Sequence, residues 1–261
     1  MKKKCAGIIR STSELATDIY ELWIETELAG DAAPGQFVGV FPSKDSLLLP
    51  RPISICEVSD DKTAIRLVYR IAGKGTTEFS HYKPGRRVWL LGVLGNGYPL
   101  EKAMDKKVLL MGGGIGIPPI VELAKQLREK MPQGDITIAV GYRNQDLFLK
   151  EELEQYGKVI IATEDGSIGT KGNVMDAIRE NQIKAELICA CGPMMMLRAI
   201  KQYAQEQQIP AYISLEERMA CGVGACLGCV CKTTHKDEHS HVNNARICTD
   251  GPVFEAEEVD I

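Results

Sequence analysis

The chain has 261 residues, of which 44% are hydrophobic and 25% are charged, a balance typical of a globular protein with room for two domains. Its net charge of −4 argues against the strongly basic surface of nucleic-acid-binding proteins. No stretch approaches the roughly 20 apolar residues of a membrane span, and "CAGII" between Lys4 and Arg10 is too short for the apolar core of a signal peptide. We therefore expect a cytoplasmic protein. Its nine cysteines are then not expected to form disulfides, because the cytoplasm is reducing.

Residues 1–100 predict short β-strands separated by turns. In "YELWIE" the apolar Leu22 and Ile24 share one face, and in "AIRLVYRI" Ile65 and Leu67 lie opposite Arg66. Further strands are predicted at 35–42, 51–58 and 86–91. Short strands with regular turns favour a small antiparallel barrel.

The sequence "LPRPISI" lies within the predicted barrel. Pro50 and Pro52 favour an extended edge strand, because proline cannot donate to a neighbouring strand. Arg51 is suited to pair with a diphosphate, and Ser54 is suited to bond a ring heteroatom.

The sequence "RIAGKGTTEF" follows in the same region. It offers Gly73 and Gly75, with Thr76 as the expected cap of a short helix, an arrangement that favours phosphate binding.

After residue 100, strands and helices alternate, as in a doubly wound parallel sheet. Strands are predicted at 106–111, 135–142, 158–163 and 185–191, and helices at 118–130, 147–156, 172–180 and 194–205.

Two turns between strands and helices could bind a nucleotide. The first, "GGGIGIPP", contains Gly112, Gly113, Gly114 and Gly116, which allow a pyrophosphate to approach the start of the next helix. It departs from G-x-G-x-x-G because Ile117 replaces the third glycine, and a tight connection alone would also explain it. The second turn contains Cys191, Gly192 and Pro193, which would equally suit a simple turn beside a buried thiol. Both should lie at the carboxyl edge of the sheet, where ligands bind in such folds.

The C-terminal segment concentrates thiols. Cys221, Cys226 and Cys229 follow C-x4-C-x2-C, and Cys248 lies further along the chain. This is the plant-type ligand spacing of a [2Fe–2S] cluster. Cys231 fits the spacing less well than Cys229.

Structural zinc is the alternative for this segment. Cys226 and Cys229 could pair with His235 and His239, but the loop between the two pairs is shorter than in zinc fingers. That set also leaves Cys221 and Cys248 unused. Cys5 and Cys56 lie in strand-like runs and are expected in the core.

Four short motifs follow one another in the order found in the ferredoxin–NADP⁺ reductase superfamily, and the chain therefore resembles that superfamily. They are R-P-x-S, G-T, G-G-G-x-G-x-P-P and C-G-P. The thiol segment narrows the resemblance to the electron-transfer subunits of NAD⁺-linked dihydroorotate dehydrogenase B, over essentially the whole chain. The resemblance implies an FAD-binding β-barrel at 1–100, an NAD-binding α/β domain at 101–213 and a [2Fe–2S] cluster-binding segment at 214–261.

The resemblance also implies residue roles and a partner. The residues expected to contact FAD are Arg51, Pro52, Ile53, Ser54, Val68, Tyr69, Arg70, Gly75 and Thr76. Electrons would pass from an FMN-containing, dihydroorotate-oxidising subunit through the cluster and FAD to NAD⁺, in pyrimidine (UMP) biosynthesis and within a heterotetramer of two plus two subunits. No side chain is expected to act as nucleophile or base, because the cofactors supply the redox chemistry.

Two other interpretations stay open. The chain could serve another redox assembly, such as a hydrogenase-linked or ferredoxin:NADP⁺ oxidoreductase, or be a nonenzymatic scaffold that binds flavin and zinc. A visible spectrum that bleaches with NADH would exclude the scaffold. The residues themselves do not select NAD over NADP. Arg143 is placed to meet the 2′-phosphate of NADP, and no acidic residue that would bind the ribose of NAD ends the strand before it. The choice of NAD therefore rests on the resemblance.

Overall fold

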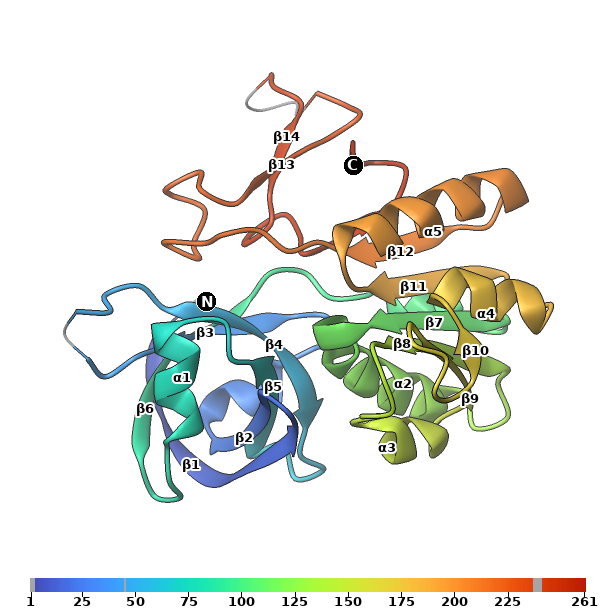
Figure 1. The fold of residues 1–261 in the computed structure, drawn as a ribbon. Helices are drawn as coiled ribbons and strands as arrows, with labels where there is room; N and C mark the ends of the chain where they lie inside the picture. The colour runs from blue at the N-terminus through green and yellow to red at the C-terminus, as the bar shows by residue number, and fades with distance from the viewer. Residues whose placement is uncertain (1–2, 45, 237–240) are drawn as a thin grey trace.

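The structure is a computed structural model that describes residues 3–44, 46–236 and 241–261 (Figure 1). Six antiparallel strands close into a barrel in the order β1-β2-β5-β4-β3-β6. They are β1 (Lys3–Ala16), β2 (Ile19–Glu25), β3 (Phe37–Phe41), β4 (Arg51–Val58), β5 (Ala64–Arg70) and β6 (Arg87–Leu94). A 3-10 helix, η1 (Glu27–Asp31), and a short helix, α1 (Lys74–Ser80), join strands of the barrel. Leu22, Ile24 and Leu67 are completely buried, as the alternation in β2 and β5 predicts.

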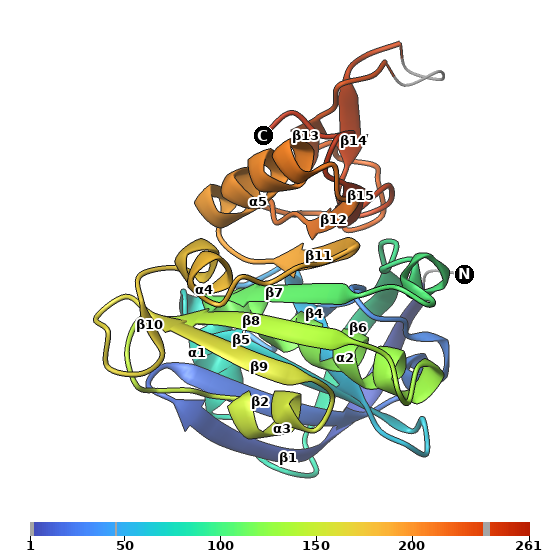
Figure 2. The same cartoon turned by 90° about the vertical axis from the view of Figure 1, so that its right-hand side faces the viewer.

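A seven-stranded sheet follows the barrel, with the order β10-β9-β8-β7-β11-β12-β15. Its strands are β7 (Val108–Gly113), β8 (Ile136–Tyr142), β9 (Lys158–Thr163), β10 (Thr170–Lys171), β11 (Leu187–Cys191), β12 (Ala211–Ser214) and β15 (Val253–Glu255). The helices are α2 (Pro118–Lys130), α3 (Lys150–Glu154), α4 (Val174–Glu180) and α5 (Met194–Gln207), with 3-10 turns η2 (Leu100–Ala103) and η3 (Gly114–Gly116). One apolar cluster joins the sheet to α2, α3 and the barrel, and another joins it to α4, α5 and the C-terminal segment (Figure 2).

The C-terminal segment is integrated into both other regions. Its strand β15 pairs antiparallel with β12, and the small hairpin β13 (Val230–Lys232) and β14 (Asn244–Arg246) extends beyond the sheet (Figure 1). The Asn96 side chain, after β6, donates to the carbonyls of Thr249 and Asp250 over 3.2 and 3.0 Å. The thiol-bearing chain is thereby attached to the barrel as well as to the sheet.

The predicted fold class, an antiparallel barrel followed by a doubly wound parallel sheet, is confirmed. Two details of the barrel differ. First, β4 lies between β3 and β5 and is not an edge strand, although its proline-containing half pairs only with β3. Second, the outer face of β5 is also buried at Arg66 and Val68, because the second region covers it.

The predicted helix at 147–156 is shorter in the structure. Leu149 has a φ of +64°, so the helix begins only at Lys150, and Phe148 and Leu149 pack into the core instead. Among the residues that the structure describes, no helix is long and apolar enough to cross a membrane.

Candidate functional site

The two glycine-containing turns meet at the carboxyl edge of the sheet, as predicted. Strands β7 and β11 are parallel neighbours, with Gly112 paired to Cys191. A cavity of about 630 Å³ opens beyond their ends, and Gly113, Gly114, Gly116, Gly192 and Pro193 contribute to its walls. Gly112 and Cys191 do not line it, because Gly112 lies inside β7 and the Cys191 thiol is buried in the core.

Glycine is required where these turns touch. A Cβ atom on Gly116 would lie only 2.6 Å from the Gly192 nitrogen and equally close to the carbonyl group of Cys191. The departure from G-x-G-x-x-G has a packing reason, because the completely buried Ile117 fills the space beneath Gly112. Helix α2 then begins at Pro118, a position where proline costs no hydrogen bond because a first-turn N–H has no partner within the helix.

The cavity also contains charged residues that the sequence patterns did not identify. Glu164 follows β9, and its N–H donates to the Tyr142 carbonyl at the end of β8, over 3.1 Å. Glu164 therefore lies beside Arg143 in the cavity wall. From the sequence, an acidic residue would be expected at the end of β8, but Glu164 follows β9, the next strand along the chain. Only the pairing of β8 with β9 brings the two together.

Arg70 brings the barrel into the same cavity. It is the last residue of β5, and it lines the cavity with Glu216 from the segment after β12. The cavity walls restrict solvation and raise the pKa of Glu216, while the nearby Arg70 guanidinium opposes that shift. A ligand in this cavity thus lies against a residue of the barrel.

The residues predicted to bind flavin lie on β4, β5 and α1. The Arg51 side chain rests against Gly75, where an added Cβ would be 3.0 Å from the guanidinium carbon. Thr76 is not the cap of α1, because Gly73 occupies that position and the Thr76 hydroxyl accepts from the Ala72 and Gly73 N–H groups at 2.9 and 3.2 Å.

Tyr69 supplies a test of whether a further ligand fits. Its side chain is buried, and its hydroxyl finds no hydrogen-bond partner among the described residues. A buried polar group without a partner is rare, and a bound ligand with a polar atom at this position would satisfy the Tyr69 hydroxyl. Val68 is also buried, in the apolar cluster shared with the sheet, so only its backbone is available to a ligand.

The four predicted cluster ligands form two thiol pairs. The Cys226 thiol affects the pKa of Cys221, and the Cys229 thiol affects the pKa of Cys248, so the members of each pair lie near one another. Cys248 is also close enough to Cys221 to interact with it electrostatically. A [2Fe–2S] cluster has two irons, each of which takes two thiolates, and this donor set fits that requirement.

The backbone around the first pair stabilises negative charge. The N–H groups of Val223, Ala225 and Cys226 donate to the Cys221 sulfur over 3.3–3.4 Å. Although burial acts in the opposite direction, these bonds lower the pKa of the Cys221 thiol to about 6, a direction that favours the thiolate form. Burial, and then the Cys229 thiol, raises the pKa of Cys248 to about 11.

The residues of the zinc alternative lie only partly within the described chain. Among the described residues, no three His, Cys, Asp or Glu side chains are grouped closely enough to hold a metal ion, and this applies to the cysteine set as well as to a zinc set. His235 is exposed, and His239 lies outside the described residues. Cys231 is partly buried on β13, while Cys5 and Cys56 are core residues as predicted.

Comparisons with known proteins match the nucleotide region and the C-terminal segment to family models. The family model for the iron–sulfur cluster binding domain of dihydroorotate dehydrogenase B matches residues 216–260, and the oxidoreductase NAD-binding domain matches residues 110–202. A solved structure of an NADH-dependent reduced ferredoxin–NADP oxidoreductase is 28% identical, with a TM-score of 0.83, and covers 100% of this chain and 91% of that one. A ferredoxin NADP⁺ reductase from Neisseria gonorrhoeae, 17% identical with a TM-score of 0.65 over 78% of this chain and 91% of that one, shares the fold.

Full-length relatives give the family. The dihydroorotate dehydrogenase B (NAD⁺) electron transfer subunit of Geobacillus sp. is 42% identical over 99% of each chain, and that of Listeria innocua is 43% identical over 97% of each chain. Each of these relatives matches nearly the whole chain at more than 40% identity, and the chain therefore belongs to the family of dihydroorotate dehydrogenase B (NAD⁺) electron transfer subunits.

Proposed function

We propose that this chain carries electrons from a dihydroorotate-oxidising partner, through a [2Fe–2S] cluster and FAD, to NAD⁺ in pyrimidine (UMP) biosynthesis. The observation that carries the proposal is the position of the barrel. Its strand β5 reaches the nucleotide cavity through Arg70, and its strand β6 contacts the thiol loop, where Gly222 lies against Leu91 and Leu94. When bound, a flavin exchanges two electrons with a nicotinamide and single electrons with an iron–sulfur cluster.

The flavin is expected along β4, β5 and α1. Arg51 would neutralise the diphosphate of FAD, and Gly75 leaves room for that side chain. The hydroxyl groups of Ser54 and Tyr69 would form hydrogen bonds with polar atoms of the flavin. The Thr76 hydroxyl, which accepts from the Ala72 N–H, would hold the backbone at the start of α1. The other proposed contacts, Pro52, Ile53, Val68 and Arg70, lie on the same two strands.

The nucleotide is expected in the cavity beyond β7 and β11. Gly113, Gly114 and Gly116 would let the pyrophosphate approach the N–H groups before α2, and Gly192 and Pro193 form the facing wall. Gly112 and Cys191 would act only through the backbone that they position. Glu164 is suited to accept from a ribose hydroxyl and to repel a 2′-phosphate, which favours NAD over NADP.

The proposed cluster ligands are Cys221, Cys226, Cys229 and Cys248. Each thiolate would bind iron, and the backbone N–H groups around Cys221 would help to stabilise the cluster's charge. Serine at any one of the four is expected to lower the iron content substantially. Full iron content and an unchanged EPR signal of the reduced protein in Cys248→Ser would remove that residue from the set.

The partner is expected to cover the thiol loop. Cys226 is exposed, and Val223 and Leu227 beside it are 43% and 64% exposed, so the loop presents apolar surface next to a proposed ligand. Electron transfer between subunits requires their cofactors to come close together, and this face permits such an approach. We propose that the partner is the FMN-containing catalytic subunit, in a heterotetramer of two plus two in the cytoplasm.

A reconstitution assay tests the function. The chain is loaded with FAD and iron–sulfur cluster, and NADH formation from dihydroorotate is measured with this chain alone, with the FMN subunit alone and with both. We expect NADH oxidation with artificial acceptors from this chain alone, and dihydroorotate-dependent NADH formation only from the mixture. Substantial dihydroorotate-dependent activity from this chain alone would refute the relay.

A second candidate follows from the likeness to the NADH-dependent reduced ferredoxin–NADP oxidoreductase structure. In that case the same three regions would serve a different redox assembly. Purification of the chain from its native source, with identification of the subunit that accompanies it, distinguishes the two candidates.

A further inference from the structure

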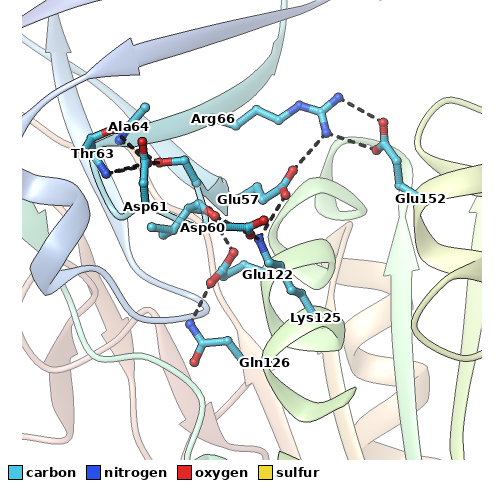
Figure 3. Close-up of polar contacts among 12 residues, drawn as sticks. Glu57, Asp60, Asp61, Thr63, Ala64, Arg66, Glu122, Lys125, Gln126 and Glu152 are labelled. Atoms are coloured by element: carbon cyan, nitrogen blue, oxygen red, sulfur yellow. Dashed lines mark hydrogen bonds and ion pairs between the residues drawn. The ribbon is translucent and has the colours of Figure 1, made fainter. Parts of the chain in front are cut away.

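A charged network joins the barrel to α2 and α3 of the nucleotide region (Figure 3). We call it the Arg66 network, and it consists of Glu21, Glu57, Asp60, Arg66, Lys125 and Glu152. The first four residues belong to the barrel, Lys125 lies on α2 and Glu152 lies on α3.

Arg66 is the centre of this network. Its side chain is only 7% exposed, and its Nε donates to Glu21 over 2.6 Å. Its two terminal nitrogens donate to the two carboxylate oxygens of Glu152 over 3.1 and 3.2 Å, and one of them also contacts Glu57 at 3.3 Å. A two-pronged contact of this kind fixes the orientation of both groups as well as their distance.

Helix α2 is attached to the barrel by neighbouring bonds. The Lys125 ammonium donates to Glu57 and Asp60 over 3.3 and 2.6 Å, and to the Val58 carbonyl over 3.1 Å. One turn earlier, the buried Glu122 carboxylate accepts from the Val58 N–H over 2.8 Å. The end of β4 is thus held to α2 through its N–H and its carbonyl.

These attachments lie a short and rigid distance from both proposed cofactor sites. Arg66 precedes Arg70 on the same strand by roughly 13 Å at about 3.3 Å per residue. Glu122 lies about 6 Å along α2 from Pro118, which directly follows the glycine turn. A shift at the network would therefore reach both ends of the cavity.

Adhesion between the two regions does not require the network. Cys56 and Val68 of the barrel pack in one apolar cluster with Ile120 of α2 and with Ile117, which directly precedes that helix. Arg66 is buried, whereas the side chains of Glu152 and Asp60 are 37% and 92% exposed. Ion pairs of this partly buried kind add little net stability, because desolvation and solvent screening offset their attraction, but they can select one geometry among several that an apolar contact would allow. The physical consequence of the network is a fixed relative position.

We propose that the Arg66 network is a positioning device, which sets the distance and angle between the flavin on the barrel and the nicotinamide in the cavity. The inference rests on the proposed function. Its residues touch neither proposed ligand, and they act through β5, α2 and α3. Hydride transfer from NADH to FAD is sensitive to such placement, since a misplacement of 1 Å can reduce a rate about a hundredfold.

The test compares two substitutions on the same helix. Glu152→Gln removes the charge that faces Arg66 and keeps the shape of the side chain. Glu154→Gln is the matched control, because Glu154 pairs at 2.7 Å with Lys150 of the same helix and with no other charged residue among those described. Arg66→Lys is a third variant, which keeps the charge and loses the two-pronged contact.

The measurements use the chain loaded with FAD and cluster. Flavin reduction by NADH is followed in a stopped-flow instrument, with the dissociation constant of NADH, the FAD content and the long-wavelength absorbance of the stacked nicotinamide–flavin complex. We expect Glu152→Gln and Arg66→Lys to reduce the rate about tenfold or more and to weaken that absorbance, with FAD content unchanged and NADH affinity within about twofold. Glu154→Gln should match the unsubstituted chain in all four measurements.

Two results would overturn the inference. One is an unchanged rate and absorbance in both Glu152→Gln and Arg66→Lys. The other is a loss of rate that only follows a loss of FAD or of folded protein, measured by thermal unfolding, because a structural role would explain it. Failure of the unsubstituted chain to be reduced by NADH would instead refute the proposed function.

Discussion

Gly116→Ala should separate the two turns that form the nucleotide cavity. The added Cβ would lie 2.4 Å from the carbonyl oxygen of Cys191 and 2.6 Å from the nitrogen of Gly192. Ordinary contacts begin near 3.4 Å, so the turns must separate by about 1 Å. The opposing atoms are backbone, which cannot rotate out of the way as a flexible side chain can. Gly116 does not have a positive φ, so the penalty is steric and not conformational.

The magnitude follows from what the displacement breaks. Overpacking of a tight contact costs about 1–3 kcal/mol of folding free energy. Loss of one charge-assisted bond to the pyrophosphate costs about 1.5–3 kcal/mol, which corresponds to a roughly tenfold to hundredfold rise in the dissociation constant of NADH. FAD binding should be unchanged, because its proposed residues lie on the barrel.

Isothermal titration with NADH and chemical unfolding measure both effects. Gly30→Ala serves as the control, because nothing lies within 4 Å of its added Cβ in η1. An alanine variant at 116 that binds NADH and unfolds like the unsubstituted chain would show that the turns are not in fixed contact, and the steric argument would fail.

Four further predictions concern single residues. Arg51→Ala should weaken FAD binding about tenfold to a hundredfold, since a charge-assisted contact contributes about 1.5–3 kcal/mol, and equal flavin retention on dilution would contradict this. Cys231→Ser should retain full iron by elemental analysis, because its partly buried thiol lies on β13 outside the two thiol pairs, and substantial loss of iron would make it a ligand. Burial raises the pKa of Glu122 above its ordinary value of 4.5. The stability that Glu122 contributes is therefore complete below pH 4.5 and declines as pH rises through the pKa of the folded state. In unfolding curves measured at a series of pH values, Glu122→Gln should lack this decline, and identical pH profiles for the two proteins would refute the assignment. Glu164→Ala should raise the NADPH/NADH ratio of kcat/KM by about fivefold or more, since a repulsion of roughly 1 kcal/mol or more is removed, and an unchanged ratio would exclude Glu164 as the selecting group.

Local patterns in the sequence predicted most of the elements. The helical spacing predicts α2 at 118–130, and the structure has the same bounds. The barrel, the parallel sheet and the meeting of the two glycine turns are also found as predicted. These features depend on short-range periodicity and on turn residues, which a chain displays within a few positions. The cysteine spacing also predicts a ligand set, Cys221, Cys226, Cys229 and Cys248, which stays a prediction.

Errors arose where a distant segment decides the environment. Arg66 occupies a polar position in an alternating strand, yet it is buried because α3 brings Glu152 against it. Glu164 lies beside Arg143 because β8 and β9 pair, and no spacing along the chain announces that contact. Cys191 lies in the core and not in the cavity wall, since its side chain belongs to the inner face of β11.

By itself, then, the sequence determined which segments are strands and helices, where the glycine turns lie and which thiols are grouped, because those properties are local. The tertiary structure alone decided that the barrel and the nucleotide region share one cavity and one charged network, and that β15 returns the thiol segment to the sheet. The physical reason is that a side chain's burial and its charged partners depend on which surfaces pack together, and packing is settled by the whole chain at once.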